Sequence, residues 1–160
     1  MAELMVDVID NADTVIGRAT INEIYAKNLN HRVIHVMLLD ADNNIALQKR
    51  LPTAHYAPGK WNSSATGIVL NNETYRQAAQ RICKENLGCL PEIKFSGKLA
   101  YRDPKGHTKF IGVFAAPHSG PFRIDANEIE QVKFFPREVI EQMAGEGSDV
   151  HPELSFVIRS

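Results

Sequence analysis

Residues 67–89, GIVLNNETYRQAAQRICKENLGC, constrain the fold of this chain more than any other segment. Asn72 stands at the expected N-cap of a helix, and Gly88 stands where a C-cap glycine belongs. The helix between them, from about Glu73 to Leu87, has an apolar stripe at helical spacing, formed by Ala78, Ala79, Ile82, Cys83 and Leu87. The segment therefore predicts a loop, a helix and a second loop.

The rest of the chain alternates between strand patterns and shorter helices. Thr20 followed by Glu23 is a capping-box pattern, which predicts a short helix after an N-terminal hairpin. Pro136 near a first turn and Gly145 beyond a last turn bound a C-terminal helix, and a short helix is expected over 151–160. Strands are expected at 4–10, 14–20, 33–40, 44–50, 67–70, 93–103, 107–117 and 128–135, and a long loop at 51–67.

This order predicts a single α+β domain over residues 1–160, with a mixed and mostly antiparallel sheet. Residues 1–30 form the N-terminal hairpin and short helix, and residues 136–160 form the C-terminal helices. The length of 160 residues and the hydrophobic content of 44% are sufficient for a sizeable core.

Charge and cysteine content argue against several classes of function. The formal net charge is -1, which gives no reason to expect a nucleic-acid partner, because such binding usually leaves a basic face. Two cysteines, Cys83 and Cys89, make neither a disulfide framework nor a zinc site, so we expect reduced thiols and a cytoplasmic location. The sequence has no signal-peptide pattern at its N-terminus and no apolar run of membrane-spanning length, so no membrane partner is expected.

The helix of residues 73–87 has one face suited to catalytic chemistry. Ile82, Glu85 and Asn86 stand at positions i, i+3 and i+4, so they share that face. Three carboxylates there would hold hard divalent cations, which neutralise a diphosphate and activate water. This chain offers one carboxylate, one amide and one apolar side chain, and the apolar side chain of Ile82 can coordinate nothing.

The same segment resembles the box of the Nudix hydrolase superfamily. That box has a glycine, a glutamate six residues on, and then the pattern Arg-Glu-apolar-any-Glu-Glu-any-Gly-apolar. The matching residues here are Gly67, Glu73, Arg81, Cys83, Glu85, Gly88 and Cys89. The family's metal ligands are the three glutamates of the helix face, and Ile82 and Asn86 replace two of them, so the box of residues 67–89 is degenerate.

The resemblance covers about residues 5–145 and points to the branch with the type I isopentenyl-diphosphate isomerases and their hydrolase-like bacterial relatives. It implies the Nudix fold, in which the loop–helix–loop packs with a mixed sheet and flanking helices. His31 matches a metal histidine of the isomerases, with His35 as an alternative. Isomerase activity is not expected, because the positions of its cysteine, a second histidine and two glutamates hold Thr66, Ile68, His107 and Lys109.

The resemblance also implies the residues of a hydrolytic site. Glu85 and Asn86 would hold Mg²⁺ or Mn²⁺ weakly, or only together with a ligand. Glu85 is equally expected to pair with Arg81 or Lys84 and to take no part in catalysis. Outside the box, Glu128 and Glu130 could supply a ligand or a base, although exposed acids of a strand are the commoner case.

Several residues around the box are candidates for ligand binding. Gly67 would let the backbone approach a phosphate, and Glu73 and Arg81, eight residues apart, would brace the loop against the helix through an ion pair. Arg50 and Lys60 flank the long loop and could meet a diphosphate. Trp61 would line the pocket or, as an alternative, pack in the core. His55, His107 and His118 are expected as surface histidines, with an anion contact as the alternative for His107 together with Lys109.

Two functions remain open at this stage. The first is a Nudix hydrolase-like protein that binds or cleaves a small diphosphate-containing compound, with metal-assisted attack of water on phosphorus. The second is a ligand-binding or interaction module that kept the fold and lost the chemistry, which the pair Ile82 and Asn86 favours. Related folds often form dimers, so a homodimer is a further expectation.

Overall fold

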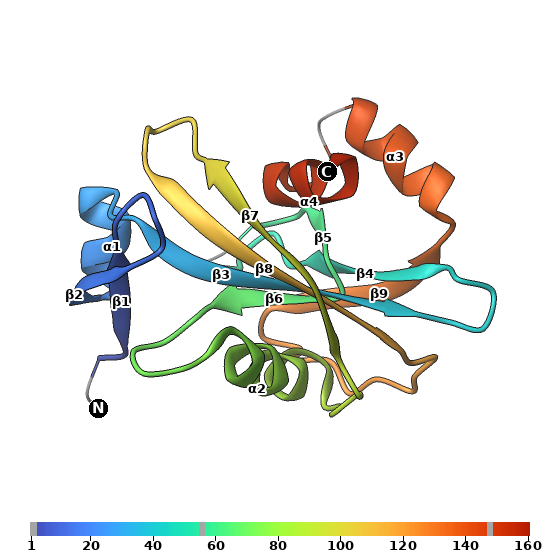
Figure 1. The fold of residues 1–160 in the computed structure, drawn as a ribbon. Helices are drawn as coiled ribbons and strands as arrows, with labels where there is room; N and C mark the ends of the chain where they lie inside the picture. Colours follow the sequence, from blue (N-terminus) through green and yellow to red (C-terminus); the bar gives the residue numbers. More distant parts are fainter. Residues whose placement is uncertain (1–2, 55–56, 147–148) are drawn as a thin grey trace.

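The computed structural model describes residues 3–54, 57–146 and 149–160. Strands and helices alternate along the chain around one large sheet, which agrees with the predicted α+β class (Figure 1). The strands are β1 (Met5–Ile9), β2 (Val15–Thr20), β3 (His31–Leu39), β4 (Ile45–Arg50), β5 (Trp61–Asn62), β6 (Ala65–Ile68), β7 (Lys94–Arg102), β8 (Thr108–Pro117) and β9 (Ile129–Phe135). The helices are α1 (Ile21–Lys27), α2 (Tyr75–Leu87), α3 (Arg137–Glu146) and α4 (Pro152–Arg159).

The N-terminal hairpin of β1 and β2 forms a small sheet of its own at one end of the molecule (Figure 1). It leads directly into α1, whose N-cap Thr20 accepts a hydrogen bond from the backbone of Glu23 while the Glu23 side chain accepts one from the backbone of Thr20. This is the predicted capping box. The hairpin and α1 enclose a separate small core around Val6, Ala19 and Ile24.

The central sheet is mixed and mostly antiparallel, as predicted. Its strand order is β5-β4-β3-β8-β7, with β6 paired to β3 and β9 paired to β4. The pairing of β3 with β8 is parallel, and the other pairings of this sheet are antiparallel. Alternation of side chains along β3 therefore divides its residues between the two faces of the sheet.

The two faces of the central sheet are covered by different helices (Figure 1). Helix α2 covers one face, where the predicted apolar stripe packs against Ile34, Val36 and Phe114. Helices α3 and α4 cover the other face, where Ile140 and Leu154 pack with Val33 and other strand residues. The molecule therefore has three layers, and α2 presents its remaining surface to solvent.

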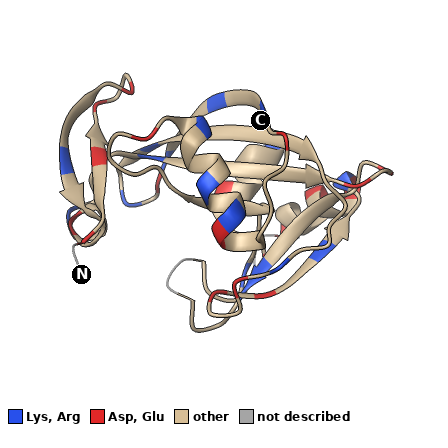
Figure 2. Cartoon of the chain, turned by 90° about the horizontal axis from the view of Figure 1, so that it is seen from below, with Lys and Arg blue, Asp and Glu red and all other residues tan. Residues whose placement is uncertain are grey.

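Charged residues of both signs are interspersed over the chain, including on α2 (Figure 2). None of the described helices is long and apolar enough to cross a membrane. Cys83 and Cys89 are both free and buried, as expected for thiols that serve as small apolar side chains.

Some predicted boundaries were wrong. The segment 51–67 is not one loop, because β5 and the start of β6 lie within it, and residues 55–56 are outside the described part. The N-cap of α2 is Thr74, which forms a capping box with Gln77, and Asn72 has instead a left-handed φ of 67°. Gly145 lies inside α3, which extends to Glu146. These differences arise because tertiary pairing and local capping decide where an element ends.

Candidate functional site

The loop before α2 is fixed to the helix by an ion pair between Glu73 and Arg81. Arg81 Nε donates to Glu73 Oε2 at 2.7 Å, and Arg81 Nη2 donates to Glu73 Oε1 at 2.9 Å, which is a bidentate geometry. Glu73 Oε1 also accepts from the backbone N–H of Leu70 at 2.8 Å, and Arg81 Nη2 donates to the carbonyl of Ile68 at 2.8 Å. The pair therefore connects the end of β6, the loop and the second turn of the helix.

The same contacts keep Glu73 ionised. Partial burial acts to raise the pKa of Glu73, but the hydrogen bonds from Arg81 and Leu70 and the charge of Arg81 outweigh it and lower the pKa below its ordinary value. Glu73 therefore acts as a fixed negative partner for Arg81 at neutral pH.

The box glycine, Gly67, lies directly against Ile82. A Cβ atom added to Gly67 would stand 2.8 Å from Ile82 Cδ1, which is closer than van der Waals contact allows. Ile82 itself is 2% exposed and belongs to the core between α2 and the sheet. At the position of a family metal ligand, this chain therefore has a packed apolar side chain that fills the space beside the glycine.

Asn86 is held in a hydrogen-bond network with the sheet. Its Oδ1 accepts from Gln48 Nε2 at 3.0 Å and from the backbone N–H of Thr66 at 3.3 Å. Gln48, fully buried, also donates to the carbonyl of Ser64 at 2.9 Å, and its Oε1 accepts from Arg50 Nη1 at 2.7 Å. Because an amide oxygen has two lone pairs, both acceptor positions of Asn86 are already occupied by protein donors.

The acids proposed from the sequence lie in different settings. The Glu85 side chain is 57% exposed and forms an i,i+4 ion pair with Arg81 Nη1 at 3.3 Å. Glu128 Oε2 accepts from Arg50 Nη2 at 3.0 Å, and Glu130 lies 3.9 Å from the Lys49 ammonium. The structure thus brings Glu128 next to a residue of the site, while Glu130 pairs with a different strand residue.

Gly67, Arg81 and Asn86 line a cavity of about 300 Å³, here called the α2 pocket. Its polar lining consists of Tyr25, Arg50, Thr66, Arg81, Glu85 and Asn86. Its apolar lining consists of Leu4, Ile21, Val33, Gly67, Ile68, Leu70 and Ile82. Arg50 and Gly67, both predicted from the sequence, therefore share one cavity with the box residues, and the N-terminal hairpin and α1 contribute one of its walls.

Trp61 and Lys60 are not part of the α2 pocket lining. Trp61 packs on the opposite face of the sheet, with its ring edge-on to Phe135 at a centroid distance of 5.0 Å. The core-packing alternative for Trp61 therefore describes its position, because β5 turns this side chain toward α4. Lys60 contributes its backbone carbonyl to the N–H of Arg50.

Four of the residues at the isomerase positions, His31, His35, His107 and Lys109, lie in a buried polar region that the sequence reasoning did not anticipate. Glu153, 1% exposed, accepts from Lys109 Nζ at 2.6 Å and bonds to His35 Nε2 at 2.9 Å. His31 stacks on His107 with ring centroids 5.7 Å apart. The Thr66 hydroxyl donates to the carbonyl of Ile34, so it is a buried structural group.

His107 was expected at the surface and is only 8% exposed, because it directly precedes β8 and its ring stacks on His31 of β3. His118 lies at the end of β8, partly exposed, and His55 is outside the described residues. The sequence signal at Glu153 is the pattern His-Pro-Glu-Leu over 151–154. It predicts a helix start with an acid in the first turn, directly before the leucine that is buried in the structure. Sequence alone does not say which strand residues this acid meets.

Nudix hydrolases generally use divalent metals such as Mg²⁺ or Mn²⁺, so the fit of this site to a cation can be tested. Among residues 3–54, 57–146 and 149–160, no group of three or more His, Cys, Asp and Glu side chains is arranged to hold a metal ion. Ile82 is packed in the core, the Asn86 oxygen is occupied, and Glu85 faces solvent beside Arg81. The described residues therefore do not fit a resident divalent-cation site.

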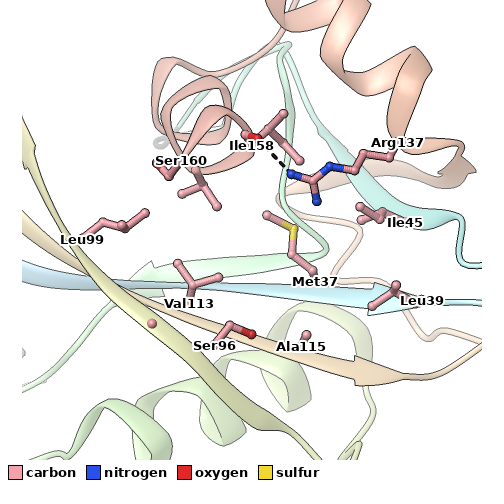
Figure 3. Close-up of a pocket in the computed structure, with 12 residues that line it drawn as sticks. Met37, Leu39, Ile45, Ser96, Leu99, Val113, Ala115, Arg137, Ile158 and Ser160 are labelled. Carbon is pink, nitrogen blue, oxygen red and sulfur yellow. Dashed lines mark hydrogen bonds between the residues drawn. The ribbon is translucent and has the colours of Figure 1, made fainter.

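A larger cavity of about 420 Å³ lies on the other face of the sheet, between β3, β7, β8 and α4 (Figure 3). Its walls are mainly apolar, and Met37, Leu99 and Val113 point into it from the strands. Arg137 is its one titratable lining residue, and the guanidinium donates to the carbonyl of Ile158 at 3.0 Å. This cavity has no acid–base pair, so we take the α2 pocket as the candidate functional site.

Comparison with known proteins agrees with this fold and identifies the family. The family model described as NUDIX domain matches residues 29–154. An uncharacterized Nudix hydrolase of Streptomyces coelicolor is 29% identical over 160 residues, which cover 99% of this chain and 88% of that protein. The uncharacterized Nudix hydrolase YfcD of Escherichia coli is 27% identical over 137 residues, covering 84% of this chain and 75% of that protein.

Solved structures show the same fold at low sequence identity. The DR0079 protein of Deinococcus radiodurans superposes with a TM-score of 0.82 at 18% identity, covering 97% of both chains. The NUDIX domain of Shewanella oneidensis NrtR, solved with ADP-ribose, gives a TM-score of 0.62 at 18% identity, covering 88% of this chain and 96% of that one. The chain belongs to the Nudix superfamily, as the sequence resemblance predicts.

Proposed function

We propose that this Nudix protein binds a small diphosphate-containing compound in the α2 pocket and has lost most or all of the family's hydrolytic activity. The observation that carries the proposal is the state of the box helix. Its supporting residues Gly67, Glu73 and Arg81 form the expected architecture, but Ile82 is buried in the core and Asn86 is bonded to the sheet. A pocket that has lost its metal-coordinating side chains can still bind a small molecule.

The class of ligand is supported by what related folds bind. Two structural neighbours were solved as an ADP-ribose complex of a Nudix domain and as a binary complex of a diadenosine tetraphosphate (Ap4A) hydrolase. ADP-ribose and Ap4A both join phosphates to an organic body, the first as a bound ligand and the second as the compound for which the hydrolase is named. The α2 pocket combines arginines with an apolar wall that suits such a compound. We therefore propose an organic diphosphate as the ligand. The free cysteines Cys83 and Cys89 support a cytoplasmic location, which we also propose.

The test measures binding and turnover on the same protein. A thermal-shift screen of nucleoside-diphosphate-linked compounds and isopentenyl diphosphate would identify ligands, and product release would be measured with Mg²⁺ and with Mn²⁺. We expect a ligand-dependent rise in melting temperature with turnover far below the usual enzymatic range of roughly 1–10³ per second. Turnover within that range would contradict the loss of activity, and no shift with any diphosphate would contradict the binding role.

A second candidate is a weak hydrolase that uses acids outside the two lost positions. Glu128 supports it, because Glu128 bonds to Arg50, which lines the α2 pocket, and Glu85 lines the same pocket. A Mg²⁺ or Mn²⁺ ion would then have to come with the phosphates of the ligand, because the protein does not provide a resident site. Measured turnover that falls in Glu128→Gln but not in Glu130→Gln would favour this candidate.

A further inference from the structure

The charged side chains that line the α2 pocket are mainly basic. Arg50 and Arg81 both line the pocket, and Glu85 is the only carboxylate in its lining. The pocket lining alone thus carries two fixed positive charges against one negative charge. The lining itself therefore lacks the excess of carboxylate oxygens that a divalent-cation site needs.

Both arginines are held in place by acids that are not part of the pocket lining. Glu73 bonds to Arg81 at 2.7 and 2.9 Å, and Glu128 bonds to Arg50 at 3.0 Å. Arg50 is also bonded to Gln48, so its guanidinium is fixed from two sides. Guanidinium groups that are oriented in advance lose less entropy when they bind a phosphate oxygen.

The carboxylate of Glu85 is positioned so that a phosphate could displace it from Arg81. Glu85 is 57% exposed, and its two contacts with Arg81 Nη1 are both 3.3 Å long. An exposed i,i+4 pair of this kind contributes little to stability, so a phosphate can replace the Glu85 carboxylate at Arg81 at small cost. At Gly67 a ligand could approach the backbone, but the Ile82 side chain fills the space beside this glycine and would keep the ligand from entering further.

We infer that the α2 pocket binds the diphosphate of its ligand directly through Arg50 and Arg81, without a divalent cation. The organic part of the ligand lies against the apolar wall, where Tyr25 and Ile21 of the α1 segment face Leu70. This inference rests on the proposed binding function and goes beyond it, because it replaces the family's metal-dependent recognition of phosphate by recognition through arginine. It also makes Tyr25 a specificity residue for the organic part.

The decisive experiment is isothermal titration with ADP-ribose and with isopentenyl diphosphate, each in EDTA and in Mg²⁺, on the wild type and on Glu85→Gln. The two modes of binding predict opposite signs for this variant. If arginines hold the diphosphate, Glu85→Gln removes a repelling charge and strengthens binding in EDTA by about fivefold, as expected for one charge at about 4 Å in water. If a cation holds it, the same variant weakens or abolishes binding, because the last acidic ligand is gone.

Controls separate the failure of this inference from the failure of the proposed function. Glu92→Gln makes the same charge change at an exposed position outside the α2 pocket and should leave affinity unchanged. Binding that appears only with Mg²⁺ and is lost in Glu85→Gln would overturn the arginine mode and leave the binding function intact. Absence of binding in both buffers would overturn both.

The contribution of the apolar wall is measured with inorganic pyrophosphate as the reference ligand. Tyr25 is 46% exposed, so Tyr25→Ala should fold. We expect this variant to weaken ADP-ribose or isopentenyl diphosphate binding about tenfold and to leave pyrophosphate binding unchanged. The reason is that adenine would stack on the Tyr25 ring and the isopentenyl group would pack against it, whereas pyrophosphate has no organic part. An equal loss for pyrophosphate, or no loss for either organic ligand, would contradict the assignment of Tyr25.

Discussion

At the scale of single residues, Ile82 and Asn86, which the sequence predicts at metal-ligand positions of the box, have structural contacts in α2. Asn86 differs from the family glutamate by one methylene group and one charge, and its oxygen serves as an acceptor for Gln48 and for the backbone of Thr66. Ile82 fills the space beside Gly67 and belongs to the core. Both replacements are therefore integrated into the packing of α2 on the sheet.

Removal of the Asn86 acceptor should destabilise the protein. Asn86→Ala leaves the N–H of Thr66 and one N–H of Gln48 without a partner, which we expect to lower the free energy of unfolding by about 1–2 kcal/mol. Asn86→Asp keeps an acceptor oxygen and should lose less. Urea denaturation of the two variants measures the difference, and an equal loss in both would show that the hydrogen bonds are not the cause.

Rebuilding the family's acids should be costly in this chain. Ile82→Glu places a carboxylate where the side chain is 2% exposed, so we expect Ile82→Glu with Asn86→Glu to lower the free energy of unfolding by about 2–4 kcal/mol without metal. If these glutamates form a cation site, Mg²⁺ should raise the melting temperature of the double variant. The wild type should not respond, and a response of equal size in the wild type would show that its own residues bind the cation.

At the scale of elements, α4 is attached to the sheet by polar as well as apolar contacts. Its first turn brings Glu153 to His35 on β3 and Lys109 on β8, two strands that lie side by side in parallel register. Leu154 and Ile158 of the same helix pack in the core. The buried charge of Glu153 thus sets which residues of the sheet α4 covers.

Loss of the Glu153 charge should weaken this attachment. Glu153→Gln removes the nearer of the two carboxylates at the Lys109 ammonium, which is 6% exposed, and leaves Asp103 at 4.0 Å. Breaking a buried pair in this way costs about 3–5 kcal/mol. Chemical denaturation should show this loss, while Glu92→Gln at an exposed position serves as the matched control. Adding Lys109→Met to Glu153→Gln should recover part of the loss, and a further decrease would contradict the buried-pair explanation.

At the scale of the whole molecule, buried histidines make the fold sensitive to acid. Burial lowers the pKa of His151 to about 4 from its ordinary 6.5; Glu153 acts in the opposite direction, and the charges of His35 and Lys109 act with the burial. His151 Nδ1 accepts the backbone N–H of Glu153 at the start of α4, which only an unprotonated nitrogen can do. The native state therefore requires this histidine to be neutral.

The sign of the pH effect follows from this requirement. Between pH 6.5 and about 4 the unfolded chain binds a proton at His151 and the folded chain does not, so the free energy of unfolding should fall by up to about 3 kcal/mol as pH decreases through this range. His151→Asn keeps a good N-cap and should flatten this part of the curve. His118→Asn is the control, and an unchanged slope in His151→Asn would contradict the assignment.

Below this range a different group acts. Burial alone would raise the pKa of Glu153, but its hydrogen bond with His35 and the charges of His35 and Lys109 lower it below the ordinary value of 4.5. Its contribution to stability is therefore present above pH 4.5 and is lost only as the pH falls further. His151 and Glu153 thus affect the pH dependence of the free energy of unfolding in different pH ranges, His151 at the higher pH and Glu153 at the lower.

Much of the fold follows from local patterns in the sequence. Helix α2, its apolar stripe and Gly88 at its end, with a φ of 64°, follow from the 3.6-residue period and from the left-handed conformation that glycine adopts easily. The hairpin of β1 and β2 and the capping box at Thr20 are equally local. Short-range spacing determines these features because the interacting residues are three or four positions apart or face each other across a turn.

The pairing of side chains in the site depends on contacts between residues far apart in the sequence, which no local pattern predicts. The sequence by itself determined the helix that carries Ile82 and Asn86 and predicted both at ligand positions. Only the tertiary structure decided that Asn86 bonds to Gln48, 38 residues away. Likewise, Glu153 reaches His35 across 118 residues. Buried polar groups must find partners wherever the fold brings them, so their pairing is decided by the packing of elements, whereas helices and turns are decided by neighbours along the chain.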